Sequence, residues 1–274
     1  MTSKLKDKVV FVTGSSAGIG EALVREASAQ GAHVVISARR EDRIRAIADE
    51  LVQLGGQALA VRADVTAEGS VEAAVQEISV RFGRLDVVIA NAGFGVEGQL
   101  NDLSLEDYRR QFETNVFGVI RTIKAAMPEL KASKGCIGVM GSTNGYLNVP
   151  GWSAYCMSKH AVRSLCACVK HELAEDGVSI THLAPGFVES DFRKTGNDSQ
   201  LKDDAQDPVP KWLQVPARDA ARTMLRAVIC RQEEAVISMH AKAAVGLERH
   251  VPWFVSKAVA ASGKIVRSLS KDAG

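Results

Sequence analysis

Residues 13–20 read Thr-Gly-Ser-Ser-Ala-Gly-Ile-Gly, and they join a short apolar run at 9–12 to a segment with helical spacing. Glycine is needed where a strand turns sharply, where backbone approaches a phosphate, and where a helix packs closely on a strand. The loop ends at a helix N-terminus, whose free N–H groups and positive dipole end attract a pyrophosphate. Ordinary turn chemistry is the competing interpretation. The strand before the loop and the helix after it favour a phosphate cradle.

The glycines of this loop are spaced G-x-x-x-G-x-G. This spacing differs from the G-x-G-x-x-G dinucleotide fingerprint, and no Lys-Ser or Lys-Thr pair follows the last glycine as in a P-loop. The spacing alone therefore does not identify the ligand. The loop residues that we expect to contact it are Gly14, Ser15, Ser16, Gly18, Ile19 and Gly20.

Beyond the loop, short β-branched runs alternate with amphipathic helical segments. Short apolar runs suit parallel strands buried on both faces, and repeated strand–helix alternation implies right-handed crossovers. The sequence predicts an α/β fold with one Rossmann-like, doubly wound domain: a seven-stranded parallel sheet with helices on both faces. Pro128 falls late in a helical stretch, where we expect it to end or kink the helix. The seven runs lie at 9–12, 33–37, 58–61, 85–90, 136–140, 178–183 and 235–238.

The composition excludes several classes of protein. The 274 residues carry a net charge of +2, so no global field indicates a nucleic-acid partner. The five cysteines include no CxxC motif, which favours reduced thiols over disulfides or a metal site. The first eight residues lack the apolar region of a signal peptide, and no stretch approaches the roughly 18 apolar residues of a membrane span. We expect a cytoplasmic protein without a membrane partner.

Two arginines, Arg39 and Arg40, follow the second apolar run. An acidic residue in this region would bind the adenosine ribose hydroxyls and select NAD(H). A guanidinium instead suits a 2′-phosphate. The alternative is that both are surface charges that open the next helix, but cations at a helix N-terminus oppose its dipole. The pair therefore favours NADP(H) as cofactor over NAD(H).

Further signatures follow in a fixed order. An Asn-Ala-Gly triplet at 91–93 follows the fourth run, Asn115 lies in a helical stretch, and Ser142 follows the fifth run. Tyr155 comes 13 residues after Ser142, and Lys159 comes four residues after Tyr155. Together with the T-G-x-x-x-G-x-G loop, these residues make the chain resemble the short-chain dehydrogenase/reductase family. The resemblance implies an NADP(H)-dependent oxidoreductase that moves hydride between the nicotinamide and a carbonyl or alcohol carbon.

The resemblance implies that the catalytic residues are Asn115, Ser142, Tyr155 and Lys159. It also implies that Lys159 binds the nicotinamide ribose hydroxyls and that Asn115 holds a water. The residues themselves support an acid/base role, because positions i and i+4 share one helix face. We expect the Lys159 ammonium to lower the pKa of the Tyr155 hydroxyl from about 10 towards the working pH, as a general acid requires. Ser142 would donate a hydrogen bond to the same substrate oxygen.

Other cofactor contacts are implied by the resemblance alone. Ser190 replaces the threonine of the family's P-G-x-x-x-T motif, so the hydroxyl is kept and a methyl is lost. Asp86 resembles a structural acid of the family, and nothing in the family gives His160 or His182 a role. The remaining implied cofactor residues are Asp64, Val65, Asn91, Ala92, Gly93, Tyr155, Lys159, Pro185, Gly186, Val188 and Ser190.

Substrate choice should come from loops at the carboxyl ends of the strands, above all a loop at about 186–216. The aromatic content of these loops favours a hydrophobic small-molecule substrate such as a ketone, a steroid-like compound or an acyl compound. Some of these side chains could instead only pack the loop onto the domain. The residues expected to line the substrate site are Ser142, Tyr146, Trp152 and Phe187.

We divide the chain into a dinucleotide-binding and catalytic domain at 1–240 and a C-terminal extension at 241–274. The extension mixes apolar and basic residues, which favours packing on the domain or on a partner subunit, with a membrane-surface helix as the alternative. A homodimer or homotetramer is expected. Two functional alternatives remain open: a catalytically vestigial protein that senses NADP(H), and a membrane-peripheral reductase that modifies lipids.

Overall fold

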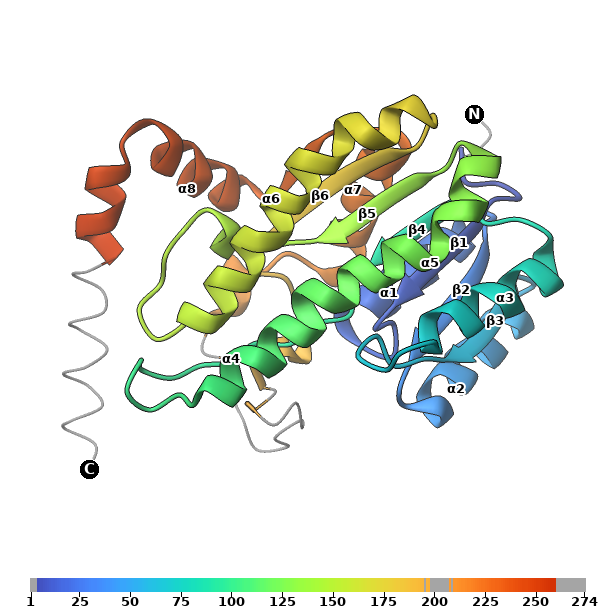
Figure 1. The fold of residues 1–274 in the computed structure, drawn as a ribbon, viewed down its shortest axis with the longest axis horizontal. Helices are drawn as coiled ribbons and strands as arrows, with labels where there is room; N and C mark the ends of the chain where they lie inside the picture. Colours follow the sequence, from blue (N-terminus) through green and yellow to red (C-terminus); the bar gives the residue numbers. More distant parts are fainter. Residues whose placement is uncertain (1–3, 195, 198–206, 208, 260–274) are drawn as a thin grey trace.

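Seven parallel strands form the centre of the molecule (Figure 1). The computed structural model describes residues 4–194, 196–197, 207 and 209–259. Strand order is β3-β2-β1-β4-β5-β6-β7, which confirms the predicted doubly wound sheet. The order reverses between β1 and β4, the point at which open α/β sheets bind ligands. The strands are β1 (Val9–Thr13), β2 (His33–Ala38), β3 (Gln57–Arg62), β4 (Val87–Ala90), β5 (Cys136–Met140), β6 (Ser179–Pro185) and β7 (Glu234–Ile237).

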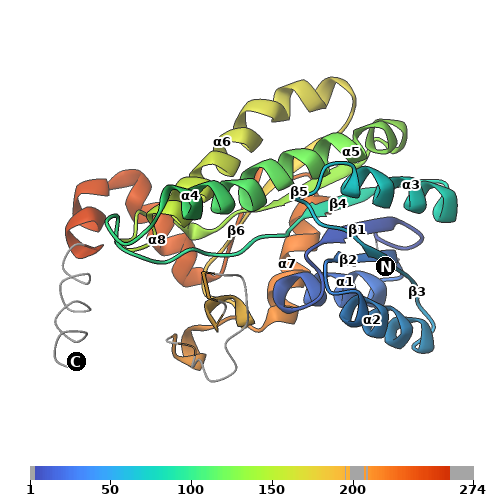
Figure 2. The ribbon, with the colours of Figure 1, turned by 60° about the horizontal axis from the view of Figure 1, so that its bottom comes forward.

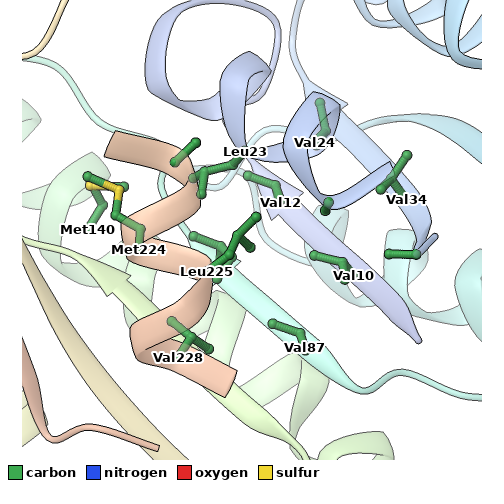
Figure 3. Packing of buried hydrophobic residues seen from close by; sticks show 14 of the residues in the cluster. Val10, Val12, Leu23, Val24, Val34, Val87, Met140, Met224, Leu225 and Val228 are labelled. Atoms are coloured by element: carbon green, nitrogen blue, oxygen red, sulfur yellow. The ribbon is translucent and has the colours of Figure 1, made fainter. Parts of the chain in front are cut away.

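Helices cover both faces of the sheet because alternate strand residues point to opposite sides. On one face, α1 (Gly18–Ala29), α2 (Glu41–Gln53) and α7 (Ala217–Ile229) bury their apolar sides. Figure 3 shows this cluster, in which side chains of α1 and α7 meet those of β1, β2 and β4. The opposite face is covered by α3 (Ser70–Phe82), α5 (Gly118–Ser133) and α6 (Ser153–Glu175). Each fully buried Val, Leu or Ile contributes about 1.5–3 kcal/mol.

Helix α5 continues through Pro128 to Ser133 instead of ending there. Proline removes one backbone donor and crowds the preceding turn. Ala126 and Leu130, on either side of Pro128, are fully buried against the sheet. This packing holds the last turn in place, because tertiary contacts outweigh local propensity in most protein helices.

Asp86 lies just before β4, at the edge of the sheet opposite the glycine loop. Its carboxylate accepts hydrogen bonds from Lys8, from Arg84 and from the backbone N–H of Val9. Burial alone would raise the pKa of Asp86, but these donors together hold it below its usual value. The contacts tie β1 to β4 and agree with a structural role for this acid.

The C-terminal part begins with α8 (Met239–His250), which buries Ala241 and Val245 against the domain. A further helix of about two turns follows at residues 252–259. Figures 1 and 2 both show these two helices, in red, at one end of the molecule outside the sheet. Residues 260–274 lie outside the described part. Within the described ranges, no helix is both long and apolar enough to cross a membrane.

Candidate active site

The glycine loop packs directly on the segment that follows β4. Gly14 has φ +65°, and a Cβ there would lie 2.6 Å from the Cα of Ala92. A Cβ on Gly20 would lie 2.4 Å from the carbonyl oxygen of Gly14. Helix α1 then begins without a side-chain cap, because its N-cap residue is Ala17. The loop therefore presents a helix N-terminus with uncapped N–H groups at the carboxyl edge of the sheet.

The two serines of this loop have different tasks. Ser15 is fully buried and donates to the carbonyl of Val12 at 2.8 Å while it accepts from the N–H of Ser37 at 2.8 Å. It therefore joins the loop to β2, and its single hydroxyl proton is donated within the protein. Ser16 instead accepts from the guanidinium of Arg40 at 2.9 and 3.2 Å. This contact brings the Arg40 charge to the rim of the loop. Both Arg39 and Arg40 are exposed.

The Asn-Ala-Gly triplet is held to the glycine loop by hydrogen bonds. The Asn91 amide donates to the carbonyls of Thr13 and Gly14 at 2.8 and 3.0 Å. The Thr13 hydroxyl accepts from the N–H groups of Asn91 and Ala92. Asn91 thus fixes the backbone of the glycine loop. Gly93, two residues later, packs against the Asn115 side chain.

The two residues expected after β3 lie in different surroundings. The Asp64 carboxylate accepts from the N–H and the hydroxyl of Thr66 at 2.9 and 2.7 Å. Val65 is buried and packs closely on Gly118. A Cβ added to Gly118 would lie 2.7 Å from the Cγ2 of Val65. Asp64 remains half-buried after β3, and Val65 anchors the turn.

Asn115 lies in a π-helical turn, Glu113–Phe117, between α4 (Leu105–Phe112) and α5. It is 1% exposed, and its amide donates to the carbonyl of Phe94 at 3.0 Å and to the Ser158 hydroxyl at 3.2 Å. Ser158 in turn donates to the backbone carbonyl of Tyr155 at 2.7 Å. Asn115 therefore fixes the first turns of α6 from the side. The sequence does not reveal the π-turn, which occurs often at functional sites.

Tyr155, Lys159 and Ser142 meet between the end of β5 and the start of α6. All three are buried, and the Lys159 ammonium donates to the Met140 carbonyl at 2.7 Å. The same ammonium lies 5.6 Å from the centroid of the Tyr155 ring. Ser142 follows β5 directly, and its hydroxyl lies near enough to the Tyr155 hydroxyl to lower the pKa of that tyrosine. The expected side-chain constellation is therefore formed.

The expected lowering of the Tyr155 pKa is wrong for this structure. Complete burial raises the pKa of the Tyr155 hydroxyl to about 12, and the Ser142 hydrogen bond offsets only part of that rise. Burial also lowers the pKa of Lys159 to about 8. Removal from water penalises both charged forms, and the ammonium is directed to the Met140 carbonyl. The desolvation of Tyr155 thus exceeds the effects that lower its pKa, which come from Ser142 and from the charge of Arg193.

Comparison with known proteins identifies the family. A family model for "short chain dehydrogenase" matches residues 8–201. This range contains the glycine loop and every member of the Asn115, Ser142, Tyr155 and Lys159 set.

The chain belongs to the short-chain dehydrogenase family.

Similar proteins include an Arabidopsis thaliana 11-beta-hydroxysteroid dehydrogenase-like 4A, 36% identical over 84% of this chain and 76% of that protein. A Thermococcus sibiricus alcohol dehydrogenase complexed with 5-hydroxy-NADP is similar in structure, with a TM-score of 0.73, 32% identity, and coverage of 85% and 96% of the two chains. A Burkholderia phymatum short chain dehydrogenase/reductase in complex with NAD has a TM-score of 0.79, 25% identity, and coverage of 90% and 94%. These similarities agree with the Rossmann-like fold and with oxidoreductase chemistry.

The segment after β6 of this short-chain dehydrogenase returns to the start of α1. Pro185 ends β6, and a Cβ on Gly186 would lie 2.9 Å from the Cβ of Ala241. Val188 is buried. Ser190 lies so near Gly18 that a Cβ added to Gly18 would be 3.3 Å from the Cβ of Ser190. The structure thus places the segment at 185–190 against the start of α1, and the resemblance assigns both to the cofactor.

Aromatic side chains surround the ring of Tyr155. The Trp152 ring meets it edge-on at 5.7 Å, and the Phe192 ring is tilted against it at 5.4 Å. A Cβ on Gly95 would lie 2.9 Å from both the Trp152 and the Phe192 rings. Trp152 was expected from the sequence, whereas the contact with Phe192 depends on the fold of the 186–216 loop.

Two other expected substrate residues lie in different surroundings. Tyr146 is 4% exposed, and its hydroxyl proton is donated to Glu234 within the protein. Phe187 stacks on His240 of α8 with ring centroids 5.7 Å apart and remains partly exposed. Phe187 therefore faces the C-terminal helix beside the site.

His182 belongs to a buried polar network that the sequence did not indicate. Its Nδ1 lies 3.2 Å from the Tyr146 hydroxyl, and Glu234 also accepts from Arg249 at 2.5 Å. Burial lowers the pKa of His182 to about 4, so the imidazole is neutral. Its Nε2 is buried without a hydrogen-bond partner among the described residues, and the ring packs against Gly141, between Met140 and Ser142. His182 thus supports the turn that carries Ser142.

Proposed function

We propose that this short-chain dehydrogenase is an NADP(H)-dependent reductase or dehydrogenase acting on a hydrophobic carbonyl or alcohol. The observation that carries the proposal is the buried meeting of Tyr155, Lys159 and Ser142 beside the glycine loop. Three polar side chains in a nearly closed site satisfy the geometric requirement for proton transfer to a substrate oxygen.

In the reductive direction, the substrate oxygen would accept hydrogen bonds from the Tyr155 and Ser142 hydroxyls. A bound NADPH supplies the hydride. Tyr155 then transfers its proton to the developing alkoxide, and the resulting phenolate is stabilised by the Lys159 ammonium 5.6 Å from its ring centroid. Asn115 and Ser158 hold the α6 backbone at Tyr155 during this transfer. In the oxidative direction the same groups act in reverse.

The cradle at α1 fits the cofactor. Gly18 and Ser190 approach each other at the uncapped N-terminus of α1, where a pyrophosphate is favoured. Structures of related proteins hold an NADP derivative in one case and NAD in another, so the choice must come from this chain's own residues. Arg40 at the rim of the loop, and the lack of an acid at the end of β2, support NADP(H).

The aromatic wall supports a hydrophobic substrate. A substrate whose oxygen reaches Tyr155 would lie against Trp152 and Phe192, which both contact the Tyr155 ring. Flat or cyclic carbon skeletons gain most from such rings, because aromatic contacts add to the burial of apolar surface. We therefore infer cyclic or aryl ketones and the matching alcohols as the substrate class.

Assembly as a homodimer or homotetramer and a cytoplasmic location remain predictions. Support for assembly comes from large apolar side chains that are exposed just before α5 and on α6, where Phe117 is 49% and Met157 is 51% exposed. Burial of such side chains against a second subunit would remove them from water.

The test of the proposed function is Tyr155→Phe. We expect NADPH-dependent reduction of a panel of cyclic and aryl ketones, followed at the nicotinamide absorbance, to fall by about 10²- to 10⁴-fold. NADPH binding, followed by fluorescence, should stay unchanged. Tyr108→Phe, which removes a tyrosine hydroxyl bonded to Ser153, is the matched control and should keep most of the turnover. Undiminished turnover in Tyr155→Phe would refute the assignment, and tight NADPH binding without turnover of any ketone would favour the sensing alternative.

A further inference from the structure

The C-terminal helical segment, defined as residues 239–259, differs in charge from the rest of the chain. It contains three lysine and arginine residues and one acidic residue, and residues 260–274 add three more bases and one acid. Together the last 36 residues carry a net charge of +4, although the whole chain carries only +2. The positive charge is therefore concentrated at the C-terminal end.

Large apolar side chains of the same segment are exposed. Val255 of the helix at 252–259 is half-buried, and so is Val251, which directly precedes the helix. The two valines are four residues apart and therefore lie on the same side. The other side presents Trp253, which is 63% exposed, and Phe254, which is 51% exposed. A short helix that exposes two large aromatic side chains outside its half-buried valines suits a second apolar environment at those side chains.

Helix α8 continues the pattern. It buries Ala241 and Val245 against the domain, while Leu247 is 46% exposed and Met239 is 79% exposed. Basic side chains stand among these apolar groups, with Lys242 exposed on α8 and the Lys257 ammonium 5.7 Å from the Trp253 ring centroid. Figure 1 shows the whole segment, in red, at one end of the molecule beside the loop that precedes α6.

Charge decides between the possible occupants of this surface. A second copy would offer either the same basic segment or a remainder of the chain whose net charge is only −2. An anionic lipid surface offers both an apolar layer at the depth of Trp and Phe and a dense negative charge for lysine and arginine. The mixture of exposed aromatic and basic side chains on short helices suits such a surface.

We propose that the C-terminal helical segment binds anionic lipid surfaces, with Trp253 and Phe254 at the acyl boundary and the neighbouring bases on the headgroups. The segment begins beside the loop at 186–216, because His240 in the first turn of α8 stacks on Phe187 of that loop. Docking would therefore place this loop, whose Phe192 contacts the Tyr155 ring, on the lipid side of the enzyme. The proposal is independent of the catalytic assignment, since lipid binding requires neither cofactor nor turnover.

The test is co-sedimentation of the full-length protein with vesicles. We expect binding to vesicles of phosphatidylglycerol and phosphatidylcholine, little binding to phosphatidylcholine alone, and loss of binding at high salt because the charges are exposed. The double variant W253S/F254S and the double variant K242E/K257E should each weaken binding by about tenfold or more. Trp212→Ser, which removes an 83% exposed tryptophan outside the segment, is the matched control and should bind as the parent does.

Light scattering of the same variants separates lipid from a second copy. We expect the oligomeric mass and the thermal midpoint of W253S/F254S to match those of the parent. Equal vesicle binding by W253S/F254S and the parent, or equal binding to charged and uncharged vesicles, would overturn the proposal. Dissociation of an oligomer by W253S/F254S, in a parent that does not bind vesicles, would overturn it in favour of a second copy.

Discussion

Lys159 brings a positive charge into a site that is almost closed to solvent, where burial lowers its pKa to about 8. The pKa of Tyr155 beside it is about 12, so the tyrosine keeps its proton over the whole physiological pH range. The form competent for reduction has a charged lysine and a protonated tyrosine, and it therefore dominates below pH 8. We expect the reductive kcat/KM to fall above pH 8 as Lys159 loses its proton, since this parameter reports ionisations of the free enzyme.

A pH profile from 6 to 10 checks this expectation. Lys159→Met should be less active throughout and should lack the decline near pH 8. A parent profile that stays flat between pH 7 and 10 would contradict the assignment of the ionisation to Lys159.

Arg40 tests the choice of cofactor at a single side chain. Its guanidinium reaches the Ser16 hydroxyl at the rim of the glycine loop, where a 2′-phosphate would gain a charged hydrogen bond. Such a bond contributes about 1.5–3 kcal/mol, so we expect Arg40→Ala to raise the Kd for NADPH by about ten- to a hundredfold. The Kd for NADH should change little.

Binding titrations by fluorescence measure both constants. Arg45→Ala, in which an exposed arginine of α2 loses its pairing with Glu41, is the matched control. An equal loss of NADPH and NADH binding in Arg40→Ala would show that the residue only maintains the loop.

The residue scale is where the sequence was least sufficient. The spacing of Tyr155 and Lys159 predicted their meeting correctly, because i and i+4 share a helix face. It could not predict that burial raises the Tyr155 pKa, since desolvation depends on the closed packing of Trp152 and Phe192 around the ring. Tyr146 was expected at the substrate, but its place is decided by Glu234, which lies 88 residues further along the chain.

At the scale of elements, the contact of α1 with the loop before it depends on one glycine. A Cβ on Gly20 would lie 2.4 Å from the Gly14 carbonyl oxygen and 2.6 Å from the Asn91 amide nitrogen. A side chain at position 20 would therefore force the backbone at Gly14 to move, because a carbonyl oxygen cannot rotate away as a side chain can. We expect Gly20→Ala to cost about 1–3 kcal/mol of unfolding free energy and to abolish NADPH binding, because the helix N-terminus moves away from the cradle.

Urea unfolding together with NADPH titration measures both effects. Gly246→Ala in α8 is the matched control, because a Cβ there meets nothing within 4 Å. That variant should be more stable by up to about 1 kcal/mol, the gain of alanine over glycine in a helix. Unchanged NADPH binding by Gly20→Ala would show that the cradle tolerates the displacement.

Element types were predictable because strand and helix have different apolar periods. The run at 9–12 became β1 with one more residue, and 136–140 became β5 without change. Helix α5 and the π-turn before it were less predictable. Pro128 indicated an end or kink, yet burial of Ala126 and Leu130 carries the helix onward. The π-turn at Asn115 changes the hydrogen-bond register without leaving a sequence pattern.

At the scale of the whole molecule, the doubly wound order follows from repeated strand–helix units, since each strand is apolar on both faces. Val10 and Val12 of β1 join the core with α1 and α7, while Val9 and Phe11 join the core with α3 and α5. What sequence patterns do not give is how distant polar groups pair. His182, Tyr146, Glu234 and Arg249 come from four elements or turns and meet only in the folded chain.

This buried network couples global stability to pH through His182. Burial lowers the pKa of His182 to about 4 from 6.5, so the folded state holds the imidazole neutral where the unfolded chain takes up a proton. The unfolded state then binds more protons between pH 6.5 and pH 4. The stability due to neutral His182 is therefore present above pH 6.5 and is lost as pH falls towards 4.

The charged groups around His182 do not reverse this direction. Attraction to Glu234 raises its pKa, but burial exceeds that effect, and Lys159 and Arg163 oppose protonation as well. The pKa of Glu234 is itself held below its usual value: burial acts to raise it, and the hydrogen bonds from Tyr146 and Arg249 outweigh burial. Loss of stability from Glu234 therefore begins at lower pH than loss from His182.

His182→Asn separates the titration from the packing. An Asn amide can still contact the Tyr146 hydroxyl, but it takes up no proton in this range. We expect the parent to lose up to about 1.4 kcal/mol of unfolding free energy per pH unit more than His182→Asn between pH 6.5 and 4, the slope of one proton. Urea unfolding of both proteins at several pH values measures the difference. Parallel pH dependence in the two proteins would mean that His182 is protonated equally in the folded and unfolded states, and that the network does not hold it neutral.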